Sequence, residues 1–120
     1  MNVLLGLDGT ELSMRALEQT IERARVMEDS ITVAVYEGAT AVDLAELEAR
    51  AGERLEAAGF EADIRRLEGN PGSQLVHLAE DDFDQIVLGG GTISPMGKIR
   101  IGDVIEFVLV NAQTTVTLVR

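Results

Sequence analysis

The chain contains no cysteine, a single lysine and no long apolar run. Without cysteine there are no disulfides and no thiolate metal or redox sites, so we expect a cytoplasmic protein. No apolar stretch approaches the roughly 20 residues that a membrane-spanning helix needs. Residues 1–8 lack a basic flank and already contain an acid, which predicts a strand and not a signal peptide.

Basic residues are also scarce as a class. The chain has 10 Lys and Arg against 21 Asp and Glu, a formal net charge of −11 in 120 residues. This balance excludes nucleic acids and anionic membranes as partners, because both require a basic patch. An acid-rich surface with only Lys98 as lysine favours a salty, halophilic cytoplasm, since salt near 1 M shortens the Debye length to about 3 Å. An ordinary acidic bacterial protein is the alternative.

What the sequence does contain is an alternation of apolar runs with segments of helical periodicity, which is typical of an α/β fold. Buried strands are expected where β-branched and aliphatic residues run together, and half-exposed strands where apolar and polar residues alternate. The five predicted strands are 3–7, 31–36, 60–65, 85–88 and 114–119.

Four helices are expected between these strands. Thr10 is predicted to cap the first helix, and Thr40 with Asp43 has the form of a capping box for the second. The third helix follows the turn at 70–73. The fourth begins at Gly102, with four apolar residues predicted to be buried: Val104, Val108, Leu109 and Ala112.

Strict alternation of five strands with four helices predicts one domain with an open, doubly wound parallel sheet. Ligands of such sheets bind beyond the carboxyl ends of the strands, where the strand order reverses. Asp8, Val35 or Tyr36, and Gly89 all fall at such strand ends. The sequence therefore places glycines and an acid on one rim of the sheet.

The segment 86–92, an apolar strand that runs into three glycines, is the most informative part of the chain. Its backbone N–H groups and those of the helix that follows Gly102 outline an anion site of the kind that holds nucleotide phosphates. The helix opens, however, on the carboxylate of Asp103, where a phosphate would be better served by a neutral hydroxyl.

Five segments along the chain resemble the universal stress proteins: 7–10, 15–17, 35–37, 83–89 and 114–120. The resemblance covers the whole chain and implies a single domain over 1–120. It also implies a flavodoxin-like five-stranded sheet with strand order 3-2-1-4-5 and helices on both faces. Members of this family commonly dimerise by antiparallel pairing of their last strands, so the expected homodimer interface is Thr115, Val116, Thr117, Leu118 and Val119.

Some universal stress proteins bind ATP through a motif of Gly, two residues, Gly, nine residues, and Gly followed by Ser or Thr. In a gap-free comparison Gly89 and Gly102 match the first and third glycines. Thr92 replaces the second glycine, and Asp103 replaces the Ser or Thr. The spacing is kept, but two of the four positions have changed.

By the same resemblance Asp8 would contact the ribose or the adenine, Val35 would offer its backbone to the adenine, and residues 88–92 would line the phosphates. The candidate cofactor is therefore ATP or another adenine nucleotide. The candidate nucleotide-binding residues are Leu7, Asp8, Val35, Leu88, Gly89, Gly90, Gly91, Thr92, Gly102, Asp103 and Val104.

Asp103 has two interpretations. The favoured one is a cap whose carboxylate accepts hydrogen bonds from its own helix, a contribution of about 0.5–2 kcal/mol. The alternative is a ligand for a cation that bridges to phosphate. As a free charge, a carboxylate near a phosphate costs on the order of several kcal/mol per contact at an effective dielectric near 20. We therefore expect ATP binding to be weakened or lost.

Other residues on the rim leave alternatives open. Gly90 and Gly91 would free additional N–H groups, with Gly91 replacing the glycine missing at Thr92, or they simply form a flexible loop. Asp8 would bind a ribose or order its own turn through an Asx-type bond. Lys98 and Arg100 would attract an anion or pair with acids.

Residues 91–98 are not a P-loop, because five residues separate the glycines and Ile99 stands where Ser or Thr is required. No metal site and no catalytic residues are expected. His77 has no Cys, Ser or second His to act with, and the acids at 80–84 are interpreted as solvated surface.

The sequence thus favours a non-catalytic stress-response or partner-binding module whose ATP phosphate motif is altered. The alternative is an adenine-nucleotide binder, for ATP, ADP or AMP, with modified phosphate contacts. A slow ATPase is the least favoured hypothesis, because no catalytic base is visible.

Overall fold

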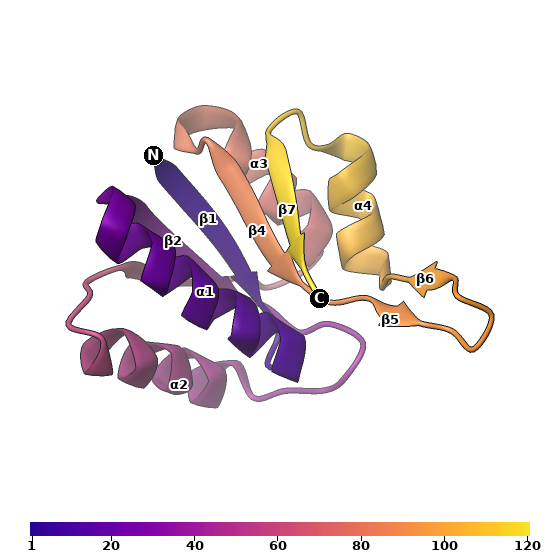
Figure 1. Ribbon diagram of the computed structural model, residues 1–120, viewed down its shortest axis with the longest axis horizontal. Helices are drawn as coiled ribbons and strands as arrows, with labels where there is room; N and C mark the ends of the chain where they lie inside the picture. The colour runs from indigo at the N-terminus through magenta and orange to yellow at the C-terminus, as the bar shows by residue number, and fades with distance from the viewer.

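The computed structural model describes residues 1–120, apart from the side chain of Ile93. Its centre is a parallel sheet with the order β3-β2-β1-β4-β7 (Figure 1). Since β7 is the fifth strand of this sheet along the chain, the predicted order 3-2-1-4-5 is confirmed. The five strands are β1 (Asn2–Leu7), β2 (Ser30–Val35), β3 (Asp63–Arg66), β4 (Gln85–Gly89) and β7 (Thr115–Val119).

Two helices cover each face of the sheet (Figure 1). Successive residues of a strand point to opposite faces, so Leu5 packs in the core under α1 and α2, and Leu4 in the core under α3 and α4. Both side chains are completely buried. The helices are α1 (Glu11–Met27), α2 (Leu44–Ala57), α3 (Pro71–Asp82) and α4 (Asp103–Asn111).

The helix starts follow local capping rules, with one correction. Thr10 caps α1 as predicted, its side chain accepting a hydrogen bond from the Ser13 N–H at 3.2 Å. Thr40 does not cap α2; Asp43 does, with its Oδ1 2.9 Å from the Ala45 nitrogen. Val42 packs against the core, so α2 begins only after Val42. In addition, the carboxylate of Asp43 is favourable at the positive end of the helix.

The burial of α4 also differs from the prediction. Val108 is buried as expected, but Ile105 is the second buried residue and Leu109 is 44% exposed. Leu109 follows Val108 directly, and one residue turns an α-helix by about 100°. The side chain of Leu109 is therefore rotated away from the sheet.

A short hairpin between β4 and α4 was not predicted. Its strands β5 (Thr92–Ile93) and β6 (Ile99–Arg100) pair antiparallel, with Thr92 opposite Arg100. Figure 1 shows it projecting beside the start of α4, at the end of the sheet where the strand arrows point. Within the described part of the chain, no helix has the length and apolarity needed to cross a membrane.

Candidate functional site

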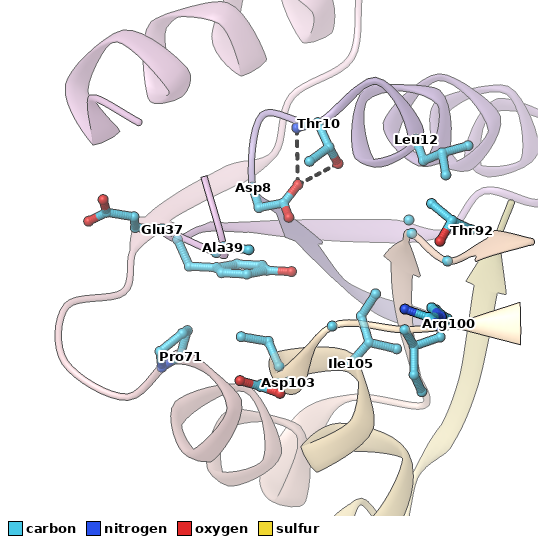
Figure 2. A pocket seen from close by; sticks show the side chains of 18 of the residues that line it. Asp8, Thr10, Leu12, Glu37, Ala39, Pro71, Thr92, Arg100, Asp103 and Ile105 are labelled. Carbon is cyan, nitrogen blue, oxygen red and sulfur yellow. Dashed lines mark hydrogen bonds between the residues drawn. The ribbon is translucent and has the colours of Figure 1, made fainter. Parts of the chain in front are cut away.

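A cleft of about 750 Å³ opens beyond the carboxyl ends of the central strands. It is lined by the segments that follow β1, β2 and β4, by β6 and by the first turn of α4. This is the place where open α/β sheets bind ligands. Figure 2 shows that Asp8, which follows β1, lies across the cleft from Thr92, Arg100 and Asp103, which all follow β4.

Most of the predicted site residues line this cleft. They are Asp8, Gly89, Gly90, Gly91, Thr92, Gly102, Asp103 and Val104. Leu7, Val35 and Leu88 do not line it, because their side chains are completely buried in the core. The Val35 carbonyl already accepts a hydrogen bond from the Leu67 N–H at 2.9 Å, so residues 36–39 form this wall instead.

Asp8 orders its own turn, as one of its two interpretations predicted. Its Oδ1 accepts hydrogen bonds from the Thr10 N–H at 3.1 Å and from the Thr10 hydroxyl at 2.6 Å (Figure 2). The other oxygen, Oδ2, lies beside Gly38, where an added Cβ would be 3.0 Å away. One carboxylate oxygen is therefore structural, and the second borders the cleft.

Tyr36 is a lining residue that the candidate set omitted. Its side chain is almost completely buried, and its ring lies so close to Gly6 that a Cβ there would be 3.2 Å from the Tyr36 Cε1. Burial, and to a lesser degree the charge of Asp8, raise the pKa of the Tyr36 hydroxyl well above its usual value. The hydroxyl is thus a neutral donor at physiological pH. Its position at the end of the second predicted strand, 31–36, was the available signal.

The glycines after β4 have structural reasons of their own. A Cβ on Gly89 would lie 2.1 Å from the Leu12 carbonyl oxygen, so only glycine lets the start of α1 approach this strand. Gly91 has a φ of 90°, a conformation that favours glycine. One of the two alternatives predicted a free N–H group at Gly90. The structure differs, because this N–H group donates a hydrogen bond to the Val119 carbonyl at 3.0 Å.

Residues 1–120 match the family model described as the Universal stress protein family. The chain belongs to this family. Its fold is similar to a universal stress protein from Archaeoglobus fulgidus at 21% identity and a TM-score of 0.82, covering 100% of this chain and 98% of that one.

Two further solved structures carry a nucleotide. A universal stress protein in complex with cAMP is 25% identical, with a TM-score of 0.77 and coverage of 100% of this chain and 96% of that one. The Archaeoglobus fulgidus protein in complex with dAMP is 21% identical, with a TM-score of 0.77 and coverage of 100% and 98%. A search of curated proteins found no significant match.

In this universal stress protein the predicted capping role of Asp103 is wrong. Gly102 is the N-cap of α4, and no side chain bonds to the first-turn N–H groups there. Asp103 is the first helical residue, one position too late, because a capping side chain must project from the N-cap itself. The alternative, a cation site, also lacks support: the described residues contain no group of three or more metal-ligand side chains. The carboxylate is exposed at the cleft.

The charged side chains that line the cleft are mostly acidic. Asp8, Glu11, Glu37 and Asp103 face a single lining base, Arg100. Figure 2 shows Arg100 with Thr92 on one side of the cleft, and Glu37 with Ala39 on the opposite side. A ligand with several phosphate groups would meet more negative than positive charge in this universal stress protein.

Two other predictions concern His77 and the basic pair Lys98 and Arg100. The His77 side chain is largely exposed, and its Nδ1 lies 3.7 Å from Glu80, which agrees with a surface role. Lys98 is exposed on the hairpin and does not belong to the cleft lining, whereas Arg100 does. The sequence did not single out the following lining residues as candidates: Thr10, Glu11, Leu12, Glu37, Gly38, Ala39, Pro71, Ile101 and Ile105.

Proposed function

We propose that this universal stress protein binds an adenine nucleotide with a single phosphate group in the cleft, and that it does not catalyse a reaction. The observation that carries the proposal is the cleft itself, in which a glycine loop and the uncapped first turn of α4 lie together. Backbone N–H groups in such a place favour a bound anion.

The relatives support a nucleotide of small charge. Two similar structures are described as complexes with cAMP and with dAMP, each of which has one phosphate group. In this chain the exposed Asp103 carboxylate at the start of α4 repels additional phosphates. A triphosphate should therefore bind more weakly than a monophosphate.

A binding role fits the side chains better than an enzymatic one. The Thr10 hydroxyl donates a hydrogen bond to Asp8 and accepts one from the Ser13 N–H, which caps α1. Both side chains therefore have a structural role at the start of the helix. His77 lies at an exposed helix position outside the cleft, with its Nδ1 3.7 Å from Glu80. A partner-binding module that holds no nucleotide is the second candidate, favoured by the acidic lining of the cleft.

The test is calorimetry in molar salt with adenosine, AMP, cAMP and ATP. We expect AMP or cAMP to bind and ATP to bind at least tenfold more weakly. Asp103→Ser should raise ATP affinity tenfold or more, which corresponds to about 1.4 kcal/mol. Glu106→Gln is the matched control, because it removes one charge from the same helix turn outside the cleft lining.

Absence of binding by every adenine compound would overturn the proposal in favour of the partner-binding module. Equal affinity for ATP and AMP in the unmodified protein would show that the Asp103 charge does not select against triphosphates.

A further inference from the structure

We propose that Arg100, carried into the cleft by the β5–β6 hairpin, binds the phosphate group of a nucleoside monophosphate and makes the site prefer it to the uncharged nucleoside. This inference rests on the proposed function and deepens it. Arg100 is the single basic residue in the cleft lining. Its guanidinium is planar and presents donors in a fork that matches two phosphate oxygens.

The hairpin places a second polar group beside Arg100. Thr92 and Arg100 are directly opposite one another in the antiparallel pair, so their side chains project from the same face of the hairpin. Both line the cleft, and Figure 2 shows them on the same side of it. A hydroxyl and a guanidinium together supply directed donors to one phosphate.

The backbone of the glycine loop offers fewer donors than the sequence suggested. The Gly90 N–H is bonded to Val119, and Gly89 is packed against the backbone of α1. Phosphate recognition must therefore depend more on side chains than it would in a loop with free N–H groups. Arg100 and Thr92 are the side chains in position to provide it.

Arg100 is also uncommitted to a partner within the protein. Among the described residues, the arginines found in ion pairs are Arg23, Arg54 and Arg66, and none of the ion pairs includes Arg100. In a chain with 21 acidic residues, an arginine that faces a cleft without a carboxylate partner is available to an anionic ligand.

A further cation lies near this rim. A Cβ on Gly91 would be 3.3 Å from the Arg120 Cδ, so the aliphatic part of Arg120 covers the loop next to the hairpin. The lining base Arg100 thus lies on the hairpin, while Asp103 lies on α4. In this arrangement Arg100 attracts a phosphate group, and Asp103 repels a longer phosphate chain.

The test compares AMP with adenosine, which lacks the phosphate, by calorimetry on Arg100→Gln, Arg100→Lys and Lys98→Gln. Arg100→Gln should weaken AMP at least tenfold and leave adenosine unchanged. Arg100→Lys should restore part of the loss, because it keeps the charge without the fork. Lys98→Gln removes a charge from the same hairpin outside the cleft lining and should change neither ligand.

The possible failures are distinct. If adenosine and AMP bind but Arg100→Gln weakens AMP less than threefold, or weakens adenosine equally, the inference is wrong and the proposed function stands. If neither compound binds the unmodified protein, the proposed function fails and the inference with it. Circular dichroism of each variant verifies the fold; Arg100 is exposed, so its substitution should leave the core intact.

Discussion

The glycines that line the cleft differ in whether packing or backbone conformation requires them. Gly89 is required by the backbone of α1, and Gly91 by its positive φ. Gly102 has a φ of −74° and open space around the position of a Cβ. Neither packing nor backbone conformation requires glycine at position 102. The consequence of glycine there is that no side chain stands between the cleft and the N–H groups of the first turn of α4.

The tight approach at Gly89 leads to a stability prediction. Gly89→Ala should lower the free energy of unfolding by at least about 1–3 kcal/mol, because the new methyl group would overlap the Leu12 carbonyl. Gly52→Ala is the matched control inside α2, where a Cβ would make an ordinary contact of 3.8 Å with Ile64. It should raise the free energy of unfolding by about 0.5–1 kcal/mol. Urea denaturation measures both; equal stability of Gly89→Ala and the unmodified protein would contradict the packing argument.

Tyr36 is a reporter for the cleft, because the chain has one tyrosine and no tryptophan. The fold raises the pKa of its hydroxyl, so the neutral form is favoured in the folded state. Its contribution to stability is complete below pH about 10, the usual tyrosine value, and is lost as pH rises through the folded pKa.

Titration of tyrosinate ultraviolet absorbance checks this prediction directly. We expect the folded protein to ionise above the value of free tyrosine, together with a loss of stability. Tyr36→Phe should remove that part of the alkaline destabilisation. Ionisation at the ordinary value, with the fold intact, would show that the hydroxyl is open to water.

At the scale of elements, the five sheet strands were predictable from short apolar runs and from the alternation of apolar and polar residues, although the predicted strand 60–65 begins later and is observed as β3 at Asp63–Arg66. The β5–β6 hairpin was not predictable, since strands of two residues are too short to show a period. The cap of α2 was misplaced because Thr40 and Asp43 are both good caps, and Val42 between them decides the matter through packing.

The candidate site was predicted in outline and missed in detail for a similar reason. Its location follows from topology, so Asp8 and the glycines were found. The role of Asp103 depended on a helix start that differs by a single residue, which periodicity does not resolve. Lys98 and Arg100 were both predicted near the rim, but only Arg100 lines the cleft, because the unpredicted hairpin decides which of the two side chains reaches it.

Strand β7 forms one edge of the sheet, with β4 on its inner side. The Val119 carbonyl bonds toward β4, so by alternation the backbone groups of Val116 and Leu118 point outward. An uncovered edge of this kind is a template for pairing with another chain. We propose that it pairs with its copy in a homodimer, as the family resemblance also implies.

Thr117 is the middle residue of β7 and provides the test of this dimer. In an antiparallel pair centred on the strand it would lie opposite its own copy, so Thr117→Lys would place two like charges together. We expect light scattering in molar salt to give a dimer for the unmodified protein and a monomer for Thr117→Lys. Gln19→Lys adds the same charge on the exposed side of α1 and should remain dimeric. A monomeric unmodified protein at micromolar concentration would rule out this interface.

For the whole molecule, the dominant physical quantity is its charge. The formal net charge is −11, and two of the ion pairs in the chain, Arg54–Glu18 and Arg66–Glu48, join partly exposed side chains. Pairs of this kind contribute about 0–1 kcal/mol each. The folded chain therefore carries a self-repulsion that its own contacts do not remove.

Salt should relieve this repulsion, and that is the prediction for the whole molecule. As the Debye length falls from about 10 Å at 0.1 M to about 3 Å at 1 M, the free energy of unfolding should rise and then level off. Urea denaturation across a series of KCl concentrations measures it, because chloride avoids the extra stabilisation that sulfate produces by exclusion from the surface. The double variant Glu22→Gln, Glu53→Gln removes two exposed charges and should flatten the series. A stability that does not change with KCl would contradict adaptation to a salty cytoplasm, because screening is the means by which salt would act on so acidic a surface.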